Sequence, residues 1–454
     1  MPGSLNFIIL CGCMQTGSRC LDCYSCLRVR ERIERVADGT KPLSMKKNMA
    51  WNTVGSFTNL VAQWLITVIV VRISSGFDAA GLYSLAVSVY GIFAPIAQYR
   101  MYTYQISDTQ HENSVGEYFT LRIITNAMAL VGCFGYAVFT CPLSALPAIL
   151  LFGLYKSLIL LLDVFHACEQ RHCRLDYVGI SLILQGIISL ALFTIAFLLS
   201  DSLELTLAIM CLGIMGVGVF YDFSRAEQFE KLRIGITFAK TKRLLLRCLP
   251  FVAGALACAA ASSVPRQFLF SEVGEAALGI YSSVAAPVAV IQNGASYMYY
   301  PLIGYFADYY AAGEKKKLLK LFARVTVGIA GVGVVSAILL ELFGGPILEL
   351  FFGNGISEYT YLLTPMIISA LVSAYMWFLN DLLIAVRDFS GNFFGNIASL
   401  AAALLVMTPF IRWWGMNGVS FTAIAASFAG VLVMAVSFLV KLRKHLRHPD
   451  TSGA

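Results

Sequence analysis

Long uncharged stretches separated by short polar turns dominate the pattern of this chain. A stretch of about 18 or more apolar residues can span the hydrocarbon core of a bilayer as a helix. These runs are too long and too continuous for barrel strands, and backbone polar groups in lipid must be satisfied internally, so helices are predicted. The predicted spans cover about 51–72, 81–102, 117–139, 146–166, 177–200, 204–222, 248–266, 277–307, 322–341, 360–384, 389–411 and 416–440. The predicted fold class is an all-α, polytopic membrane protein with about twelve transmembrane helices.

Two segments, 71–94 and 264–307, follow the same pattern and predict an internal repeat. The run DAAGLYS in the first answers EAALGIYS in the second, and an arginine precedes each copy, Arg72 and Arg266. Chance similarity between two apolar hairpins is the alternative. A repeat indicates two equivalent halves, here two pseudo-symmetric six-helix bundles with a pathway between them.

The spans and the polar segments between them predict the domain organisation. An N-terminal bundle and a C-terminal bundle are joined by a basic linker, and both ends of the chain are predicted to be cytoplasmic. The predicted boundaries are 1–48 for an extension, 49–223 for the first bundle, 224–247 for the linker, 248–440 for the second bundle and 441–454 for the tail.

The extension over 1–48 contains a cluster of cysteines. The cluster consists of Cys11, Cys13, Cys20, Cys23 and Cys26. Its C-x2-C-x2-C spacing is compatible with a metal or an iron–sulfur cluster. The prolines and the second ligand pair of a defined site are missing, so we expect a disordered extension with no metal and no cofactor. It also lacks the basic region and the cleavage site of a signal peptide.

The charge balance of the 454-residue chain is a signal of topology. The formal net charge is +7, yet only 13% of residues are charged, against about 25% in a soluble domain. With both termini in the cytoplasm, only Arg72, Arg266 and Arg412 among the basic residues are predicted outside, and Lys156 lies within a helix. Enrichment of Lys and Arg on the cytoplasmic side sets membrane orientation. We therefore expect a multi-pass protein of the cytoplasmic membrane and no nucleic-acid partner.

The fourth predicted span contains two charges within the membrane. Lys156 lies near its centre, and Asp163 follows on the same face, two turns or about 10 Å away. A charge at that depth costs at least about 2.5 kcal/mol and by default marks a functional site that faces a partner or a wet cavity. The alternative is a Lys–carboxylate pair that only joins helices.

The succession of segments over about 45–440 resembles bacterial oligosaccharide-lipid flippases. These form the polysaccharide-transporter branch of the multidrug, oligosaccharidyl-lipid and polysaccharide exporter superfamily. The order and spacing of several short segments give the resemblance its weight. They are Arg72 to Tyr83, Arg100 with QISD to Asp108, Lys156 through Asp163 to Gln170, Arg174 to Asp176, LPF to Phe251 with Pro265-Arg266, Gly274, Gly279 to Tyr281, and Tyr309 to Lys317. The cysteine-bearing extension departs from the family.

The resemblance implies two six-helix bundles around a cavity that opens alternately to each side. It implies as substrate an oligosaccharide on an undecaprenyl pyrophosphate carrier, destined for capsule, O-antigen or exopolysaccharide. In such flippases basic cavity residues hold the pyrophosphate, which needs fixed counter-charge in a low-dielectric region. Lys156 is the first candidate here because it is intramembrane, followed by Arg72, Arg266 and Arg100. The expected partners are this lipid, the membrane lipids and a polysaccharide polymerase or export machinery.

The energy source and the alternative functions can also be considered from the motifs of the chain. The chain has no phosphate-binding G-x4-G-K-[ST] loop and no H-E-x-x-H motif, so no nucleotide is expected and energy must come from a gradient or from substrate flow. Asp163 is the candidate carrier of a coupling proton. The short external loops disfavour an enzyme such as a membrane polysaccharide polymerase. A drug or cation antiporter would need carboxylates without a basic centre, and a peptidoglycan-precursor flippase of the same superfamily stays open.

Overall fold

A computed structural model describes residues 42–447 except 75, 109–111, 300–301 and 354. Of the extension predicted over 1–48, only 42–48 are described, so the cysteine cluster lies outside the described residues. Within the described part every regular element is a helix, and twelve of these helices are long and apolar enough to cross a membrane. The predicted fold class is therefore confirmed. Their apolar runs are long enough to cross the hydrocarbon core of a bilayer, and helices satisfy their backbone polar groups within the segment.

The chain forms two compact units. Among the described residues, unit 1 contains 42–73 and Phe93–Leu249, and unit 2 contains Ser74–Ile92 and 250–447. The start of the second span thus packs with unit 2, although it follows the first span directly in the chain. The bundle boundaries predicted from the sequence remain predictions.

The elements of unit 1 follow the six predicted spans. They are α3 (Met45–Ile73), the end of α4 (Asp78–Gln98), α5 (Met101–Ser107), α6 (Val115–Thr140), η2 (Leu143–Ala145), α7 (Leu146–Arg171), α8 (Leu175–Ser200), α9 (Leu203–Val217), the π-helical turn η3 (Gly218–Asp222), α10 (Phe223–Ala226) and the beginning of α11 (Phe238–Val273).

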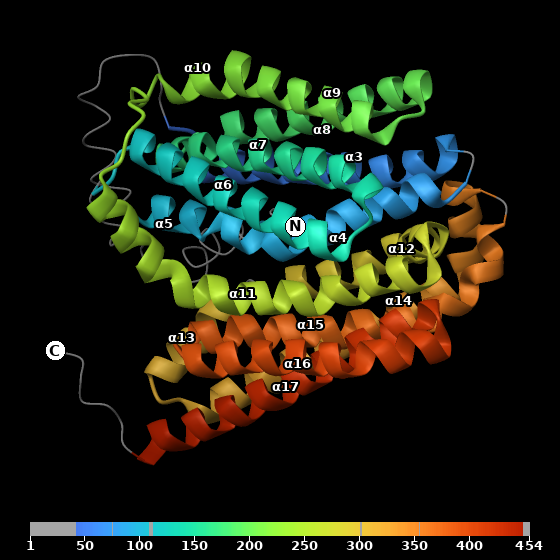
Figure 1. The fold of residues 1–454 in the computed structure, drawn as a ribbon. Helices are drawn as coiled ribbons and strands as arrows, with labels where there is room; N and C mark the ends of the chain where they lie inside the picture. Colours follow the sequence, from blue (N-terminus) through green and yellow to red (C-terminus); the bar gives the residue numbers. More distant parts are fainter. Residues whose placement is uncertain (1–41, 75, 109–111, 300–301, 354, 448–454) are drawn as a thin grey trace. The chain divides into compact units, whose positions relative to one another are not determined.

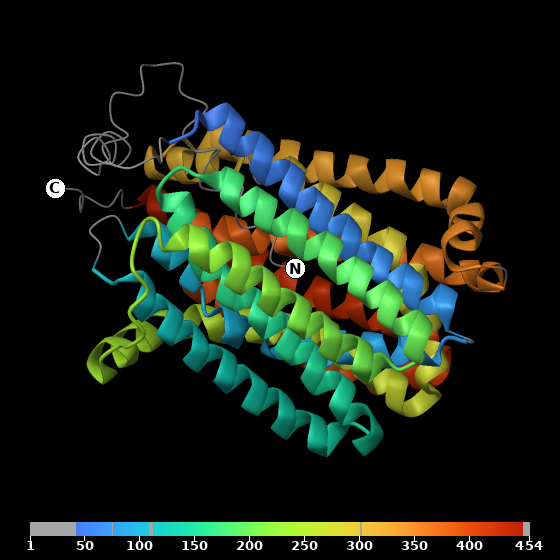
Figure 2. The same cartoon turned by 90° about the horizontal axis from the view of Figure 1, so that it is seen from above.

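Helices α3 and α8 run side by side along unit 1 (Figures 1 and 2). Glycines make this possible: a Cβ on Gly55 would lie 2.5 Å from the carbonyl oxygen of Gly179, and a Cβ on Gly179 would lie 2.4 Å from that of Trp51. Small residues at such crossings let helix backbones approach closely in a membrane. The pair therefore packs through backbone contact that any side chain at these positions would prevent.

Unit 2 contains the remaining helices. They are the start of α4, most of α11, α12 (Glu275–Tyr299), α13 (Ile303–Ala311), α14 (Lys315–Phe352), η5 (Ile356–Leu362), α15 (Leu363–Ala385), α16 (Phe389–Trp414) and α17 (Met416–Arg447). Helices α15, α16 and α17 lie next to one another (Figure 1). A buried cluster of aromatic and aliphatic side chains fills the interior of this unit between α12, α13, α14, α15 and α17.

The two copies of the repeat meet inside unit 2. A Cβ on Gly81 of α4 would lie 2.0 Å from the carbonyl oxygen of Glu275, and a Cβ on Gly279 of α12 would lie 2.2 Å from that of Phe77. In the repeat, Gly81 corresponds to Gly279 and Phe77 corresponds to Glu275. Gly81 of the first copy contacts Glu275 of the second, and Gly279 of the second copy contacts Phe77 of the first. The contact is reciprocal, as expected at a two-fold axis. This symmetry supports the repeat over chance similarity.

Three predicted segments differ from the structure. The helix predicted over 277–307 ends at Tyr299 and a new one begins at Ile303. The span predicted over 322–341 is too short, because α14 continues to Phe352 through Pro346. The span predicted to begin at 248 begins at Phe238. Both α14 and α11 contain proline inside the helix. Each proline removes one backbone hydrogen bond, but the helix continues past it.

Candidate functional site

Lys156 lies in the middle of α7 and points toward α3. Its Nζ donates a hydrogen bond of 2.9 Å to Oε1 of Gln63 and lies 5.6 and 5.3 Å from the ring centroids of Phe152 and Tyr155. Attraction of a cation to aromatic faces strengthens when the site is desolvated. The side chain is thus held by a neutral amide and by two rings.

A short chain of amides extends from Lys156 to α8. The Nε2 of Gln63 donates to Oδ1 of Asn59, and the Nδ2 of Asn59 donates to the carbonyl oxygen of Leu182 at 3.1 Å. Among the described residues no ion pair involves Lys156. The predicted alternative, a Lys–carboxylate pair that joins helices, is therefore wrong. Because its partner is neutral, the charge of Lys156 is left to attract an anion.

Asp163 belongs to a different network on the same helix. Its Oδ1 lies 3.7 Å from Nδ1 of His166, whose Nε2 lies 3.3 Å from Oδ1 of Asp222 and 3.0 Å from Oγ of Ser181. The Asp163 side chain is 20% exposed, whereas those of His166 and Asp222 are 3% and 0% exposed. The structure therefore separates Lys156 and Asp163 into two polar groups along α7.

Arg100 connects α4 and α5. It has a left-handed backbone conformation, with φ 57°, and is half-buried. A left-handed backbone conformation is uncommon for a residue other than glycine, and here it marks a sharp turn between two helices. Its role as a substrate-binding residue stays a prediction.

At the other end of α5, the carboxylate of Asp108 organises the approach to α6. It accepts hydrogen bonds from the backbone amides of Glu112 and Asn113, at 3.0 and 3.1 Å, and from the phenol of Tyr118 at 2.8 Å. Burial by itself would raise the pKa of Asp108, but these hydrogen bonds and the charge of Arg171 outweigh it and lower that pKa. Asp108 is thus a fixed anion of the loop between the helices.

The two arginines that precede the repeat copies lie in different units. Arg72 is exposed at the end of α3 in unit 1, and Arg266 is half-buried in α11 in unit 2. Their role as substrate-binding residues also stays a prediction. The four basic candidates lie on separate helices or helix junctions. Of these candidates, Lys156 shares α7 with Asp163.

The polar partners of Lys156 and Asp163 were not predicted, although the sequence contains patterns that place some of them on one helix face. Asn59, Gln63 and Thr67 recur every four residues in an otherwise apolar helix, which places them on one face. The run Asp163-x2-His166-x2-Glu169 likewise places two carboxylates and an imidazole on one face of α7. Asp222, by contrast, joins this group only through tertiary contact. Within the described part of the chain no group of three or more His, Cys, Asp or Glu side chains could hold a metal ion.

The fold is similar to that of solved membrane transporters. The structure of a multidrug resistance MATE family transporter in its outward-facing conformation superposes with a TM-score of 0.58 at 11% identity, covering 86% of this chain and 94% of that one. The Vibrio cholerae MATE transporter VcmN superposes with a TM-score of 0.59 at 11% identity, covering 94% of this chain and 99% of that one. At these identities the likeness concerns the fold.

A relative known from its sequence is similar over nearly its whole length. It is the capsular polysaccharide biosynthesis protein CapF of Staphylococcus aureus, 23% identical over 397 residues, covering 86% of this chain and 98% of that protein. No family model matches the chain. The relative, by its sequence, and the structural neighbours, by their fold, are consistent with the resemblance that the sequence indicated.

Proposed function

We propose that this multi-pass membrane protein is a flippase for an undecaprenyl-pyrophosphate-linked oligosaccharide. The observation that carries the proposal is Lys156, a cation within the membrane whose hydrogen-bond partner is the neutral Gln63. A diphosphate that crosses a low-dielectric region needs such a charge, and an ammonium held by one neutral amide remains available to it. The capsule-related name of the relative supports a polysaccharide precursor as the substrate class.

We propose a transport cycle of alternating access. The bundles proposed over 49–223 and 248–440, joined by the basic segment 224–247, alternate in opening the site to the two sides. We place both termini in the cytoplasm of a bacterial cytoplasmic membrane, because the basic segments then face the side that the positive-inside rule requires. Arg72, Arg100 and Arg266 are proposed as further contacts of the pyrophosphate and sugar, and a polymerase or export machinery as the recipient of the product.

The proposal is tested by complementation of a strain that lacks its own repeat-unit flippase. Surface polysaccharide is measured with the wild-type chain, with Lys156→Ala and with Lys242→Ala, a control in which an exposed lysine of unit 1 is removed. We expect the wild type and the control to restore polymer and Lys156→Ala to abolish it while it still inserts into the membrane. Restoration by all three variants would remove Lys156 from the site, although the flippase function would stand.

A drug or cation antiporter is the second candidate, because one structural neighbour is described as a multidrug resistance transporter. Such a protein would lower the accumulation of ethidium in the same cells without restoring any polysaccharide. A buried cation opposes binding of a cationic drug by direct repulsion. If the wild type exports ethidium, and Lys156→Ala improves this export, the flippase proposal is wrong.

A further inference from the structure

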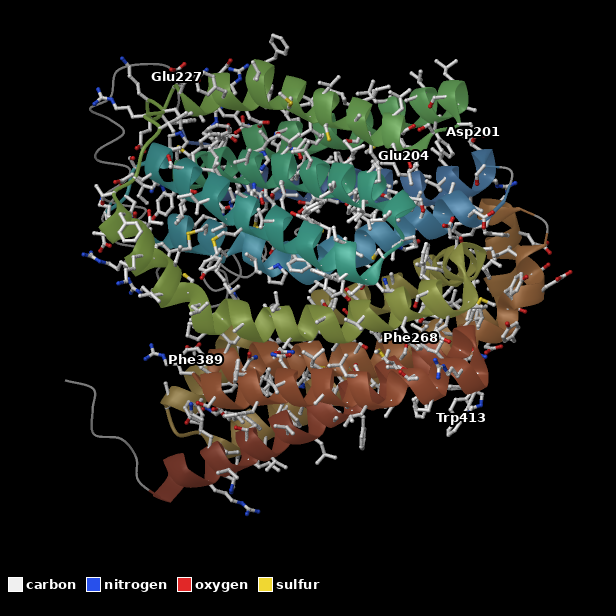
Figure 3. The ribbon with its side chains drawn as sticks, in the orientation of Figure 1. Asp201, Glu204, Glu227, Phe268, Phe389 and Trp413 are labelled. Atoms are coloured by element: carbon white, nitrogen blue, oxygen red, sulfur yellow. The ribbon has the colours of Figure 1, made fainter. Side chains whose placement is uncertain are left out.

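A second polar group in unit 1 surrounds His166 near the end of α7. We define the His166 centre as Asp163, His166 and Glu169 of α7, Ser181 of α8 and Asp222 of η3. Figure 3 shows Glu227 at one end of the helices of unit 1 and the α8–α9 turn, with Asp201 and Glu204, at the other. The His166 centre lies toward the Glu227 end, because α7 ends at Arg171 and Asp222 is close to Glu227 in the chain.

The imidazole of His166 lies between two carboxylates. Its Nδ1 is 3.7 Å from Asp163 Oδ1 and its Nε2 is 3.3 Å from Asp222 Oδ1. The residue itself is 2% exposed, and Asp222 is fully buried. A ring with a carboxylate at each nitrogen can satisfy both only when both nitrogens carry a proton. The geometry therefore favours an imidazolium in the resting centre.

Glu169 adds a further acid that lacks a protein partner. It is 0% exposed, and neither of its carboxylate oxygens accepts a hydrogen bond. The Oδ2 of Asp222 has no hydrogen-bond partner either. Three carboxyl groups around a single imidazole cannot all be ionised in a buried place without strong repulsion, so the group must hold protons in common.

The other elements around the centre offer little compensating charge. From α8, Gln185 donates to Ser181 at 2.9 Å and is neutral. Arg174 and Asp176 lie at the start of α8 and are paired with each other, with Nη2 and Oδ2 2.8 Å apart. From α5, Gln105 donates to the carbonyl oxygen of Val164. These neighbours leave the acids of the centre in excess over its cation.

The cations at the ends of the neighbouring elements have other partners. From α10, Arg225 lies over the rings of Tyr177 and Tyr221, with centroid distances of 5.1 and 5.7 Å. At the end of α7, Nη2 of Arg171 lies 3.5 Å from Oε2 of Glu230. Both arginines thus have partners beside the His166 centre, and within the described part of the chain neither forms an ion pair with its carboxylates.

The backbone at Asp222 is itself unusual. The residue ends η3, a π-helical turn that interrupts the helix between α9 and α10. Such turns insert an extra residue, so they rotate the side chains that follow, and they occur often at functional sites. At the start of this turn, a Cβ on Gly218 would lie 2.7 Å from Cδ2 of Leu162 in α7. The turn and the close approach together bring the Asp222 carboxylate to His166.

We propose that the His166 centre binds one exchangeable proton whose uptake and release drive the transport cycle, with His166 and Asp222 as its main carriers. Asp163 is the more exposed member, so it is the point where the proton enters or leaves. This inference rests on the proposed function and goes beyond Asp163 alone. Lys156 and Asp163 share α7 at about 10 Å, so the anion site and the proton site lie on one rigid element.

The first test measures the protonation of His166 in the full chain. The protein is labelled with 15N-histidine and reconstituted in lipid, and the signal of His166 among the five histidines is assigned with His166→Gln. At pH 7.5 we expect both ring nitrogens to carry protons and Asp222→Asn to convert the ring to a neutral tautomer. A neutral ring in the wild type, or one unchanged by Asp222→Asn, would overturn the proposal.

The second test measures coupling in proteoliposomes. The probe is undecaprenyl pyrophosphate carrying a short fluorescent oligosaccharide, and its distribution is followed with and without a pH gradient. For one proton, a gradient of about one pH unit changes the equilibrium distribution by about a factor of ten. We expect this change in the wild type and in His172→Gln, a control at the residue that follows α7, whose ring stacks on Phe229.

The variants separate the possible failures. His166→Gln and Asp222→Asn should still move the probe to an equal distribution but should lose the tenfold effect of the gradient. A wild type that moves the probe regardless of the gradient, or a His166→Gln variant that keeps the full effect, overturns the proton proposal alone. If no variant moves the probe, the proposed function is wrong, and the protonation of His166 is still decided by the first test.

Discussion

The two units are built from similar helices but bury different side chains. Among the described residues, the buried acidic, basic and histidine side chains of unit 1 are Asp108, Arg122, His166, Glu169 and Asp222. In the described part of unit 2, Asp388 is the buried charged residue, and it caps the start of α16 by accepting from the amide of Gly391. Buried charges are costly unless they are paired or used. The difference teaches that the candidate chemistry is concentrated in unit 1.

Unit 2 fills its interior with rings and neutral amides. Phe378 is fully buried, with ring centroids 5.3 Å from Tyr299, 5.7 Å from Phe306 and 5.8 Å from Phe322. Nearby, Oδ1 of Asn380 accepts hydrogen bonds from Asn392 at 2.7 Å and Asn396 at 2.8 Å. Neither group changes charge near neutral pH. Besides these rings and amides, the phenol of Tyr299 donates a hydrogen bond of 3.1 Å to Oδ2 of Asp381, which is half-buried. Unit 2 thus relies mainly on packing, whereas unit 1 buries more charged groups.

The largest expected effect on stability is in the aromatic cluster of unit 2. Phe378→Ala removes the ring that packs against the other rings of the cluster. Such a substitution lowers the free energy of unfolding by about 3–5 kcal/mol because a cavity remains. The thermal midpoint in detergent should fall clearly. The control Phe428→Ala removes a ring that is 58% exposed and should leave the midpoint nearly unchanged. Equal midpoints for the two variants would contradict the packing role of unit 2.

In unit 1 the corresponding effect should come from a buried charge. Arg122 is 1% exposed, and its Nη1 donates to the carbonyl oxygens of Ala97 and Gln98 at the end of α4. Arg122→Met should lose about 1.5–3 kcal/mol, since hydrogen bonds from a charged donor contribute that much. Thermal unfolding measures it, with the exposed Arg243→Met as control. A stable Arg122→Met would show that the unit does not depend on its buried charges.

A smaller effect is expected at the reciprocal contact of the repeat. Gly81→Ala and Gly279→Ala each place a Cβ within 2.2 Å of a backbone oxygen. The backbone must shift, which costs about 1–3 kcal/mol. Because the contact is reciprocal, the two variants should lose similar amounts of stability. Gly331→Ala, with open space around it, should be neutral or slightly stabilising in the same thermal assay. Very unequal losses at the two glycines would break the symmetry.

The smallest effect is expected at the exposed ion pair of unit 2. Nη2 of Arg412 lies 2.9 Å from Oε1 of Glu272, and the arginine side chain is 60% exposed. Exposed ion pairs contribute little because water and salt screen them. Glu272→Gln should therefore leave the thermal midpoint and the polysaccharide phenotype at the wild-type level. A clear loss of stability would mean that unit 2 also relies on charge, and the contrast between the units would weaken.

Most of the fold was predictable because the bilayer imposes a simple rule on the sequence. Twelve apolar spans predicted twelve helices, and their order survives in the structure. The errors lie at the ends of helices: the span predicted to end at 341 continues as α14 through Pro346 to Phe352. Helix ends depend on which backbone groups find partners, and a single residue pattern does not specify this.

The candidate site was predictable only in part. Lys156 and Asp163 stand out in the sequence because a charge in an apolar span is expensive. Their partners do not stand out. Gln63 is a neutral residue 93 positions from Lys156 in the chain. Asp222 lies at the end of the predicted span over 204–222, where a charged residue is not unusual.

The sequence by itself determined the membrane-spanning helices, the repeat and the intramembrane charges, because apolar length, internal similarity and burial cost are properties of the chain alone. Tertiary structure decided which charge faces which partner. It separated Lys156, held by a neutral amide, from Asp163, which joins His166 and Asp222. It did so because α7 packs against α8 and η3 and reaches α3 through the Lys156 side chain, which sets distances of a few ångströms. Electrostatic interactions in a low-dielectric interior depend on those distances.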